Sequence, residues 1–247
     1  MRYFFEIAYD GKSYHGWQRQ DNAITVQEVV EEALTRITRA DTSIMGSGRT
    51  DTGVHCKQQF FHADFEKKVD AEKLRFKLNS YLPSDISIQK INPVQDKAHA
   101  RFDALLRAYE YKITKRKDPF QHGFSYYYSK PLDIITMNEA ATLLVGEKDF
   151  EAFSRVKTEV NNFICNITEA KWSEEGDTFI FSIKANRFLR GMVRAIVGTL
   201  LLVGSGKLTK SGFQEIIESR DRRNAGSAAP AEGLFLNAVE YPKEIYL

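Results

Sequence analysis

The chain has 247 residues, with 35 Lys and Arg against 33 Asp and Glu, so its formal net charge is only +2. Its hydrophobic content of 43% and aromatic content of 12% are those of an ordinary soluble globular protein with one large or two small domains. This composition excludes a uniformly basic nucleic-acid binder, so any contact with nucleic acid is expected to be local.

Several other classes are excluded by short-range patterns. The two cysteines, Cys56 and Cys165, lack C-x-x-C spacing, and the five histidines do not cluster at metal-ligand spacing, so we expect no metal and no disulfide scaffold. Glu6 interrupts the first apolar run, which argues against a signal peptide. The longest apolar run, residues 195–203, is too short to span a bilayer. We therefore expect a cytoplasmic protein with no membrane association.

The first half of the chain predicts alternating strands and helices. Residues 2–9 place Tyr3, Phe5, Ile7 and Tyr9 on one face, which is typical of a half-buried strand. Thr25 and Glu28 form a capping box before a helical pattern. The remaining elements are a strand near 58–64, a helix from about 70 that stops before Pro83, and a strand from 86.

The second half repeats this rhythm loosely. Residues 107–114 alternate as a strand, and Thr136 and Glu139 predict a capped helix that ends at Gly146. The later elements are predicted as a hairpin formed by 167–172 and 179–183, helices at 188–203 and 211–219, and a strand at 234–241. The pattern predicts an α+β protein with antiparallel sheets, divided into residues 1–104 and 105–247.

One segment concentrates chemistry on a glycine-rich turn. Residues 46–48 (GSG) lead into residues 49–55 (RTDTGVH), where Arg49 and Asp51 are two positions apart. The glycines allow turn conformations and the close approach of a ligand. A guanidinium near Asp51 favours the ionised carboxylate. The residues alone fit either an exposed ion pair or a carboxylate placed to attack a substrate.

Basic and aromatic side chains in the second half suggest a binding face. Arg187, Arg190 and Arg194 follow at i, i+3 and i+7, which predicts one side of a helix. Arg107 shares a strand face with Tyr109, which favours a cleft position for that tyrosine over an apolar core, whereas Tyr111 is expected in the core. Such basic clusters, including those at 107–117 and 220–223, are usually just solvated surface.

The motifs together resemble those of the tRNA pseudouridine synthase A family. Besides residues 49–55, the resemblance rests on segments in order along the whole chain: 9–20 (YDGKSYHGWQRQ), 25–27 (TVQ), 79–86 (NSYLPSDI), 99–104 (HARFDA), 107–111 (RAYEY), 186–198 (NRFLRGMVRAIVG) and 229–236 (APAEGLFL). Two positions depart from the family pattern: Glu232 replaces a common histidine, and Cys56 replaces a small residue. Neither departure touches the candidate catalytic residues.

The resemblance implies a fold and an activity. It implies two ferredoxin-like (RRM-like) halves whose antiparallel sheets join into one extended sheet, with a basic cleft between the halves. It also implies a homodimeric isomerase that converts uridine to pseudouridine at positions 38–40 in the anticodon arm of tRNA, without metal or cofactor. The target nucleotide is expected to flip out of its stack.

The resemblance further implies roles for individual residues. Asp51 is the catalytic carboxylate, Arg49 holds it, Tyr109 packs against the target uracil, and Arg194 reaches the active site. Arg187 and Arg190 are expected to meet phosphates, and Arg107 is expected to bind RNA. Asp51 has three open routes: addition to C6 of uracil, attack on C1′, or removal of a proton from C2′.

Two alternatives remain at this point. A non-catalytic RNA-binding module can use exposed aromatics on a ferredoxin-like sheet, although such a module gains nothing from a carboxylate facing phosphates. A carbohydrate hydrolase with Asp51 as nucleophile requires a second carboxyl group within about 5 to 10 Å, and no carboxylate near in sequence is an obvious partner.

Overall fold

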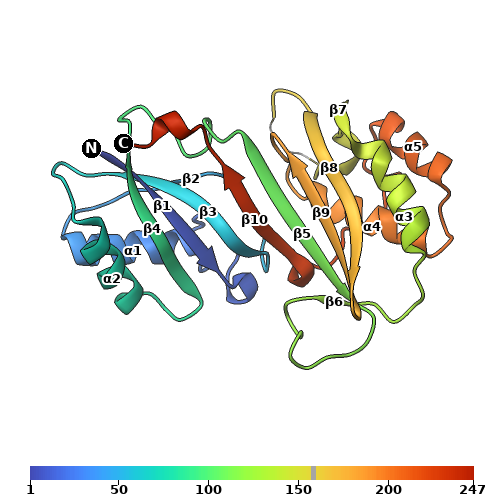
Figure 1. Ribbon diagram of the computed structural model, residues 1–247, viewed down its shortest axis with the longest axis horizontal. Coiled ribbons are helices and arrows are strands. Elements are labelled where there is room, and N and C mark those ends of the chain that lie inside the picture. The colour runs from blue at the N-terminus through green and yellow to red at the C-terminus, as the bar shows by residue number, and fades with distance from the viewer. Residues whose placement is uncertain (157–159) are drawn as a thin grey trace. The chain divides into compact units, whose positions relative to one another are not determined.

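The computed structural model describes residues 1–156 and 160–247 and shows two compact units (Figure 1). Unit 1 comprises Met1–Leu106 together with Leu236–Leu247, and unit 2 comprises Arg107–Phe235. The predicted division placed 105–247 in the second half, whereas the contacts within the chain group its last twelve residues, 236–247, with unit 1.

Unit 1 is built on an antiparallel sheet with the order β4-β1-β3, in which β2 pairs with β3 on a separate branch and β10 also lies next to β3. Its helices α1 and α2 contact each other, and α2 also packs on β4. The bounds are β1 (Arg2–Tyr9), α1 (Val26–Thr38), β2 (Met45–Gly46), β3 (His55–Asp64), α2 (Ala71–Tyr81), β4 (Ile86–Val94) and β10 (Leu234–Glu240).

Within unit 2 the strand order is β5-β9-β8-β7, and the short β6 pairs in parallel with β5. Its three helices contact one another, and α3 packs on β8. The bounds are β5 (Leu106–Thr114), β6 (Tyr126–Tyr127), α3 (Ile134–Ala141), β7 (Gly146–Asp149), β8 (Ile164–Glu175), β9 (Thr178–Ala185), α4 (Met192–Gly204) and α5 (Lys210–Ser219). Short 3-10 turns lie at Gly11–Ser13, Thr142–Leu144, Glu151–Phe153, Ala231–Gly233 and Lys243–Ile245.

Side-chain caps explain where the helices begin. Thr25 accepts a hydrogen bond from the backbone N–H of Glu28, as predicted, and starts α1. The prediction for α3 was wrong, because Asp133 is the cap: its carboxylate accepts the N–H groups of Ile135 and Thr136. Asp133 lies three residues before Thr136, so the helix begins earlier than predicted, at Ile134; it ends at Ala141.

The first strand alternates between buried and half-buried residues as predicted, with one exception on its second face. Phe4, on the face predicted to be exposed, is 0% exposed. Its ring lies 5.0 Å from that of Tyr241, which also packs edge-on against Phe60. Tyr241 is more than 230 residues from Phe4 along the chain, so the local alternation in β1 cannot predict that Tyr241 packs on Phe4.

The last residues of the chain are bound into unit 1 by backbone and side-chain hydrogen bonds. Val239 donates its N–H to Oε1 of Gln58 (3.1 Å), and the N–H of Leu105 donates to the carbonyl of Glu240 (2.8 Å). Farther on, the hydroxyl of Tyr241 donates to the carbonyl of Ala100 (2.5 Å). The C-terminal segment is therefore an integral part of unit 1.

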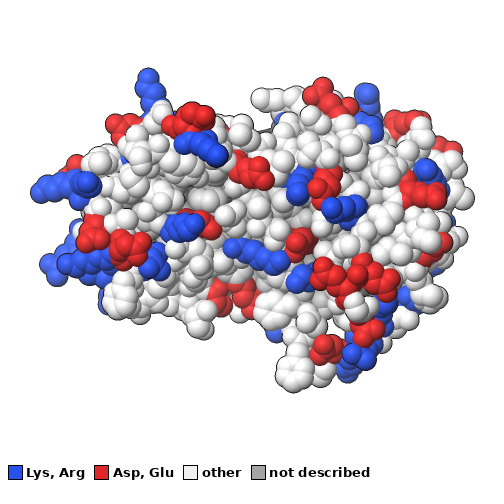
Figure 2. Space-filling view, in the orientation of Figure 1, with Lys and Arg blue, Asp and Glu red and all other residues white. Residues whose placement is uncertain are grey.

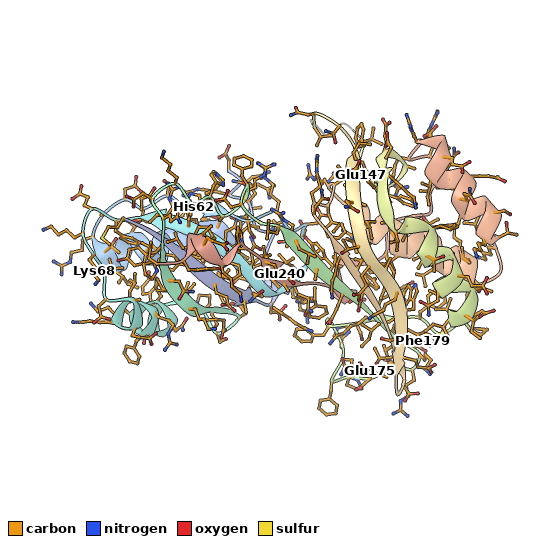
Figure 3. All side chains as sticks on the ribbon, turned by 45° about the horizontal axis from the view of Figure 1, so that its top comes forward. His62, Lys68, Glu147, Glu175, Phe179 and Glu240 are labelled. Carbon is orange, nitrogen blue, oxygen red and sulfur yellow. The ribbon has the colours of Figure 1, made fainter. Side chains whose placement is uncertain are left out.

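A buried histidine fastens a connecting turn in unit 1. His62, carried by β3 (Figure 3), is 8% exposed, and its Nδ1 accepts the N–H of Ala100 at 3.1 Å. Burial, together with the nearby Arg2 and His99, lowers the pKa of His62 to about 4, although Asp64 and Asp103 oppose this effect. The ring is therefore neutral at pH 7 and can accept that hydrogen bond.

We expect this histidine to make folding pH-dependent. The unfolded chain protonates His62 near its ordinary pKa of about 6.5, whereas the folded chain resists protonation until about pH 4, so stability falls as the pH drops through this window. In urea titrations between pH 7.5 and 4.5, His62→Gln should lose less stability than the wild type. The exposed His15, changed to Gln, is the control, and equal pH profiles for wild type and His62→Gln would contradict the assignment.

Candidate active site

The Asp51 turn connects β2 to β3 in unit 1. Asp51 is half-buried, and its carbonyl accepts the N–H of Val54 at 3.1 Å, which closes a tight turn. Gly53 has a φ of +76°, a left-handed conformation that a residue with a side chain rarely adopts. The turn thus holds a carboxylate-bearing residue in a fixed backbone geometry, and such a group can serve as a nucleophile or a base.

The opening segment of the chain supports this turn through two close approaches. A Cβ on Gly11 would lie 1.9 Å from the carbonyl oxygen of Val54, and a Cβ on Gly16 would lie 2.3 Å from that of Thr50. Backbone hydrogen bonds run in both directions, because Trp17 N–H donates to Thr50 and Gly53 N–H donates to Tyr14. The two motifs are therefore joined physically, with glycines where their backbones meet.

A buried hydrogen-bond relay lies under the same turn. The hydroxyl of Tyr9 lies 2.8 Å from Oγ1 of Thr50 and donates to Oε1 of Gln59, which is 0% exposed. The Gln59 amide in turn donates to the carbonyl of Gly48 at 3.0 Å. Sequence reasoning missed Gln59, because β3 contains several other polar residues and its pattern does not distinguish the buried one.

Two neighbours of Asp51 in the motif, His55 and Arg49, have different environments. His55 is 2% exposed; its Nδ1 accepts the N–H of Gly11 at 3.2 Å and lies 3.0 Å from a carboxylate oxygen of Asp10, so it ties the turn to the opening segment. Arg49 is exposed, and its Nε donates to Oε1 of Gln18 at 3.0 Å. Gln18 then donates to Gln27 on α1, so Arg49 is oriented by a chain of amides.

Tyr109 lies on β5 in unit 2 and is half-buried. Its ring meets that of Phe188 edge-on, with centroids 5.1 Å apart. Tyr111 is 0% exposed and its hydroxyl donates to the carbonyl of Pro230, so the prediction that Tyr111 belongs to the core is confirmed. Arg107 donates from Nη1 to the carbonyl of Asn186 at 2.8 Å.

Arg194 lies in the first turn of α4, held by a segment that crosses the helix. Its Nε donates to the carbonyl of Ala229 (2.7 Å), and Ala229 N–H donates back to the Arg194 carbonyl (2.9 Å). The crossing is tight at Gly198, where a Cβ would lie 1.8 Å from the Ser227 carbonyl oxygen. The missing side chain at Gly198 therefore permits the contact that orients the Arg194 guanidinium.

The prediction that three arginines line one side of a helix was wrong. The helix α4 begins at Met192, so Arg187 and Arg190 precede it. The reason is Gly191, whose φ of +71° is left-handed and cannot continue a right-handed helix. Arg187 donates from Nη1 to Oδ1 of Asn162 at 3.4 Å.

The two sequence clusters of basic residues are partly neutralised. Lys115 and Arg116 pair with Glu174 and Asp177 of the β8–β9 hairpin, and Arg223 pairs with Asp221. In each unit, the face seen in Figure 2 carries Lys and Arg interspersed with Asp and Glu. These residues therefore offer less positive charge than their sequence suggests.

The predicted site residues are divided between the units. Asp51 and Arg49 belong to unit 1, and the other five belong to unit 2: Arg107, Tyr109, Arg187, Arg190 and Arg194. Within residues 1–156 and 160–247, no group of three or more His, Cys, Asp or Glu side chains is placed to hold a metal ion. No helix in this part of the chain has the length and apolar character needed to cross a membrane.

Comparison with known proteins identifies the family. The family model described as tRNA pseudouridine synthase matches residues 7–103 and 140–242. The tRNA pseudouridine synthase A of Bacteroides fragilis is 50% identical over 248 residues, covering 100% of this chain and 98% of the relative. The protein of the same name from Parabacteroides distasonis is 48% identical and covers 99% of this chain and 98% of the relative. The one from Porphyromonas gingivalis is also 48% identical and covers 100% of this chain and 99% of the relative.

The family-model match spans both units and includes the Asp51 turn and the Arg194 helix, and the match to the Bacteroides fragilis protein also covers β5. The chain belongs to the tRNA pseudouridine synthase family.

Proposed function

We propose that this protein isomerises uridine to pseudouridine at positions 38–40 in the anticodon arm of tRNA, with Asp51 as the catalytic carboxylate. The observation that carries the proposal is the Asp51 turn. Close backbone contacts at Gly11 and Gly16 and the buried hydrogen bonds beneath the turn hold it in place, and the chain belongs to this family. Such rigid support is what a reacting group requires and what a surface ion pair does not.

The reaction needs a carboxylate and a closed pocket and no net redox change. The bond between ribose C1′ and uracil N1 breaks, the base turns over, and C5 bonds to C1′ while its hydrogen passes to solvent. Asp51 serves by adding to C6, by attacking C1′, or by taking the C2′ proton. We propose that the reaction uses no metal and no cofactor.

The remaining residues hold the substrate in this proposal. Tyr109 packs against the target uracil, and its edge-on contact with Phe188 fixes the orientation of the Tyr109 ring on β5. Arg194, oriented by Ala229, pairs with the charge at Asp51, and Arg49 holds the Asp51 carboxylate in place. Arg107, Arg187 and Arg190 contact the RNA backbone.

The proposal extends to the architecture. We propose two ferredoxin-like halves that flank a basic cleft, with their sheets continuous, in a cytoplasmic homodimer that binds one tRNA across both subunits. The strand order β4-β1-β3 with β2 antiparallel to β3 supports this for unit 1, because a ferredoxin-like sheet has that order. The antiparallel neighbours β5, β9 and β8 support it for unit 2.

Release of tritium tests the reaction directly. Transcripts of tRNA tritiated at C5 of uridine, each with uridine at only one of positions 38, 39 and 40, are incubated with the protein in the presence of EDTA. We expect tritium in water from each transcript and none from a transcript with cytidine at all three positions. Binding of tRNA without release would instead favour an RNA-binding module that lacks chemistry.

A further inference from the structure

Two side chains of α1 continue the hydrogen bonds that lead away from Arg49. Gln27 lies in the first turn of the helix and is 9% exposed, and Glu31 lies one turn farther on, with 12% of its side chain exposed. The Gln27 amide donates from Nε2 to Oε1 of Glu31 at 2.9 Å. The bonds that run from Arg49 to Gln18 and on to Gln27 therefore end at a carboxylate.

Groups that can only donate or only accept fix the orientation of the Gln27 amide. Its Nε2 donates to two acceptors, Oε1 of Glu31 and the carbonyl of Ile44, the second at 3.2 Å. Its Oε1 accepts from the backbone N–H of Arg19 at 3.2 Å and from Nε2 of Gln18 at 2.9 Å. A rotated amide would place donor against donor at Arg19 and acceptor against acceptor at Glu31. One orientation of Gln27 therefore satisfies all of these groups.

The orientation of Gln27 determines that of Gln18. Because Oε1 of Gln27 faces Gln18, the Gln18 side chain must turn its amide nitrogen toward Gln27 and its oxygen toward Arg49. That oxygen accepts the Nε–H of Arg49 at 3.0 Å. In the reverse orientation two donors would meet, and the guanidinium would lose this contact. The carboxylate of Glu31 thus decides which end of Gln18 is offered to Arg49.

The carboxylate at the end of this network is itself held in place. Oε1 of Glu31 also accepts the backbone N–H of Ile44 at 3.1 Å, which joins α1 to the residue just before β2. The backbone N–H of Gln27 donates to the carbonyl of Trp17 at 3.0 Å. The start of the helix is therefore attached to the segment that carries Gln18.

We propose that Glu31 and Gln27 are positioning residues for Arg49 in the reaction. This inference rests on the proposed function, in which Arg49 holds the Asp51 carboxylate in place. Arg49 is exposed, and an exposed arginine gives up rotamer freedom when it adopts a single geometry. The network removes part of that freedom before RNA binds, so it acts on the rate of reaction at the Asp51 turn more than on the affinity for tRNA.

The first test compares Glu31→Leu, which removes the acceptor, with Glu31→Gln, which keeps one. At saturating tRNA, Glu31→Leu should release tritium about tenfold more slowly than the wild type, the factor that corresponds to one lost hydrogen bond, with an unchanged KM. Glu31→Gln should stay within about twofold of the wild type, because it gives up only the ion pair with the exposed Arg19. Glu32→Leu, at an exposed position of the same helix, is the matched control and should keep wild-type turnover.

A second comparison separates positioning from a general loss of structure. Arg49→Ala should reduce turnover, and adding Glu31→Leu to Arg49→Ala should slow the reaction no further, because Glu31 acts through Arg49. A general disturbance of α1 would instead lower turnover by the same factor in both backgrounds. That result, or wild-type kcat in Glu31→Leu, would overturn this inference alone. A wild type that releases no tritium would overturn the proposed function.

Nitrogen–proton NMR tests the network without turnover. The signal of the Arg49 Nε–H group is assigned by its loss in Arg49→Ala. We expect this proton to exchange with water faster in Glu31→Leu than in the wild type, and at the wild-type rate in Glu31→Gln and Glu32→Leu. The same chemical shift and exchange rate in Glu31→Leu and the wild type would overturn the inference, whatever the tritium assay shows.

Discussion

Replacing Asp51 with asparagine is expected to reduce tritium release from tRNA by at least about 10³-fold, because loss of a reacting group costs this much or more in enzymes. An amide has nearly the shape of the carboxylate but cannot act as the nucleophile or base. The backbone bond from Val54 to the Asp51 carbonyl and the glycine contacts do not involve the side chain, so the turn should persist.

The dissociation constant for tRNA separates chemistry from binding in this variant. It should change much less than turnover, because the other RNA-binding residues are intact. Asp41→Asn, which alters an exposed carboxylate in the same unit, is the charge-matched control and should keep wild-type turnover. Activity of Asp51→Asn within a few-fold of the wild type would exclude Asp51 as the catalytic carboxylate.

Replacing Gly11 with alanine should damage both stability and the active site. The new Cβ would lie 1.9 Å from the Val54 carbonyl oxygen and 2.5 Å from its carbon, and a backbone group cannot move aside as a flexible side chain does. We expect the free energy of unfolding to fall by about 3 kcal/mol, the upper part of the usual range for overpacking. Because Val54 closes the Asp51 turn, turnover by the folded fraction should fall too.

Gly48→Ala provides the matched control in the same region. A Cβ on Gly48 meets nothing within 4 Å, so urea denaturation should show a change below about 1 kcal/mol. Equal losses of unfolding free energy in Gly11→Ala and Gly48→Ala would show that the close approach of Gly11 to Val54 is not the cause of the loss. Wild-type turnover in Gly11→Ala would show that the Asp51 turn tolerates displacement of Val54.

Local patterns were sufficient for much of the fold. The cap at Thr25 and the helical pattern within residues 188–203 depend on residues close in sequence, and the structure has the Thr25 cap and, from Met192, the helix α4. The burial of Phe4 in β1 involves Tyr241, and only the folded chain brings that residue to Phe4. Long-range packing of this kind leaves no periodic signal.

The site shows the same limit. The motif around Asp51 is visible in the sequence, but its support by Gly11, Gly16 and Gln59 arises from contacts between separate segments. Arg187 and Arg190 have helical spacing, yet one glycine in a left-handed conformation removes them from the helix. Spacing predicts a shared face only where the backbone stays regular.

Unit 1 is discontinuous in the chain, and this has a consequence for the order of events during synthesis. Residues 236–247, which bond to Gln58, Ala100 and Leu105, leave the ribosome after the whole of residues 107–235. Domains usually fold in the order in which they are made. Here the first unit to emerge is completed last, so in the nascent protein β3 lacks its neighbour β10, and Phe4 lacks its contact with Tyr241, until residues 236–247 have emerged.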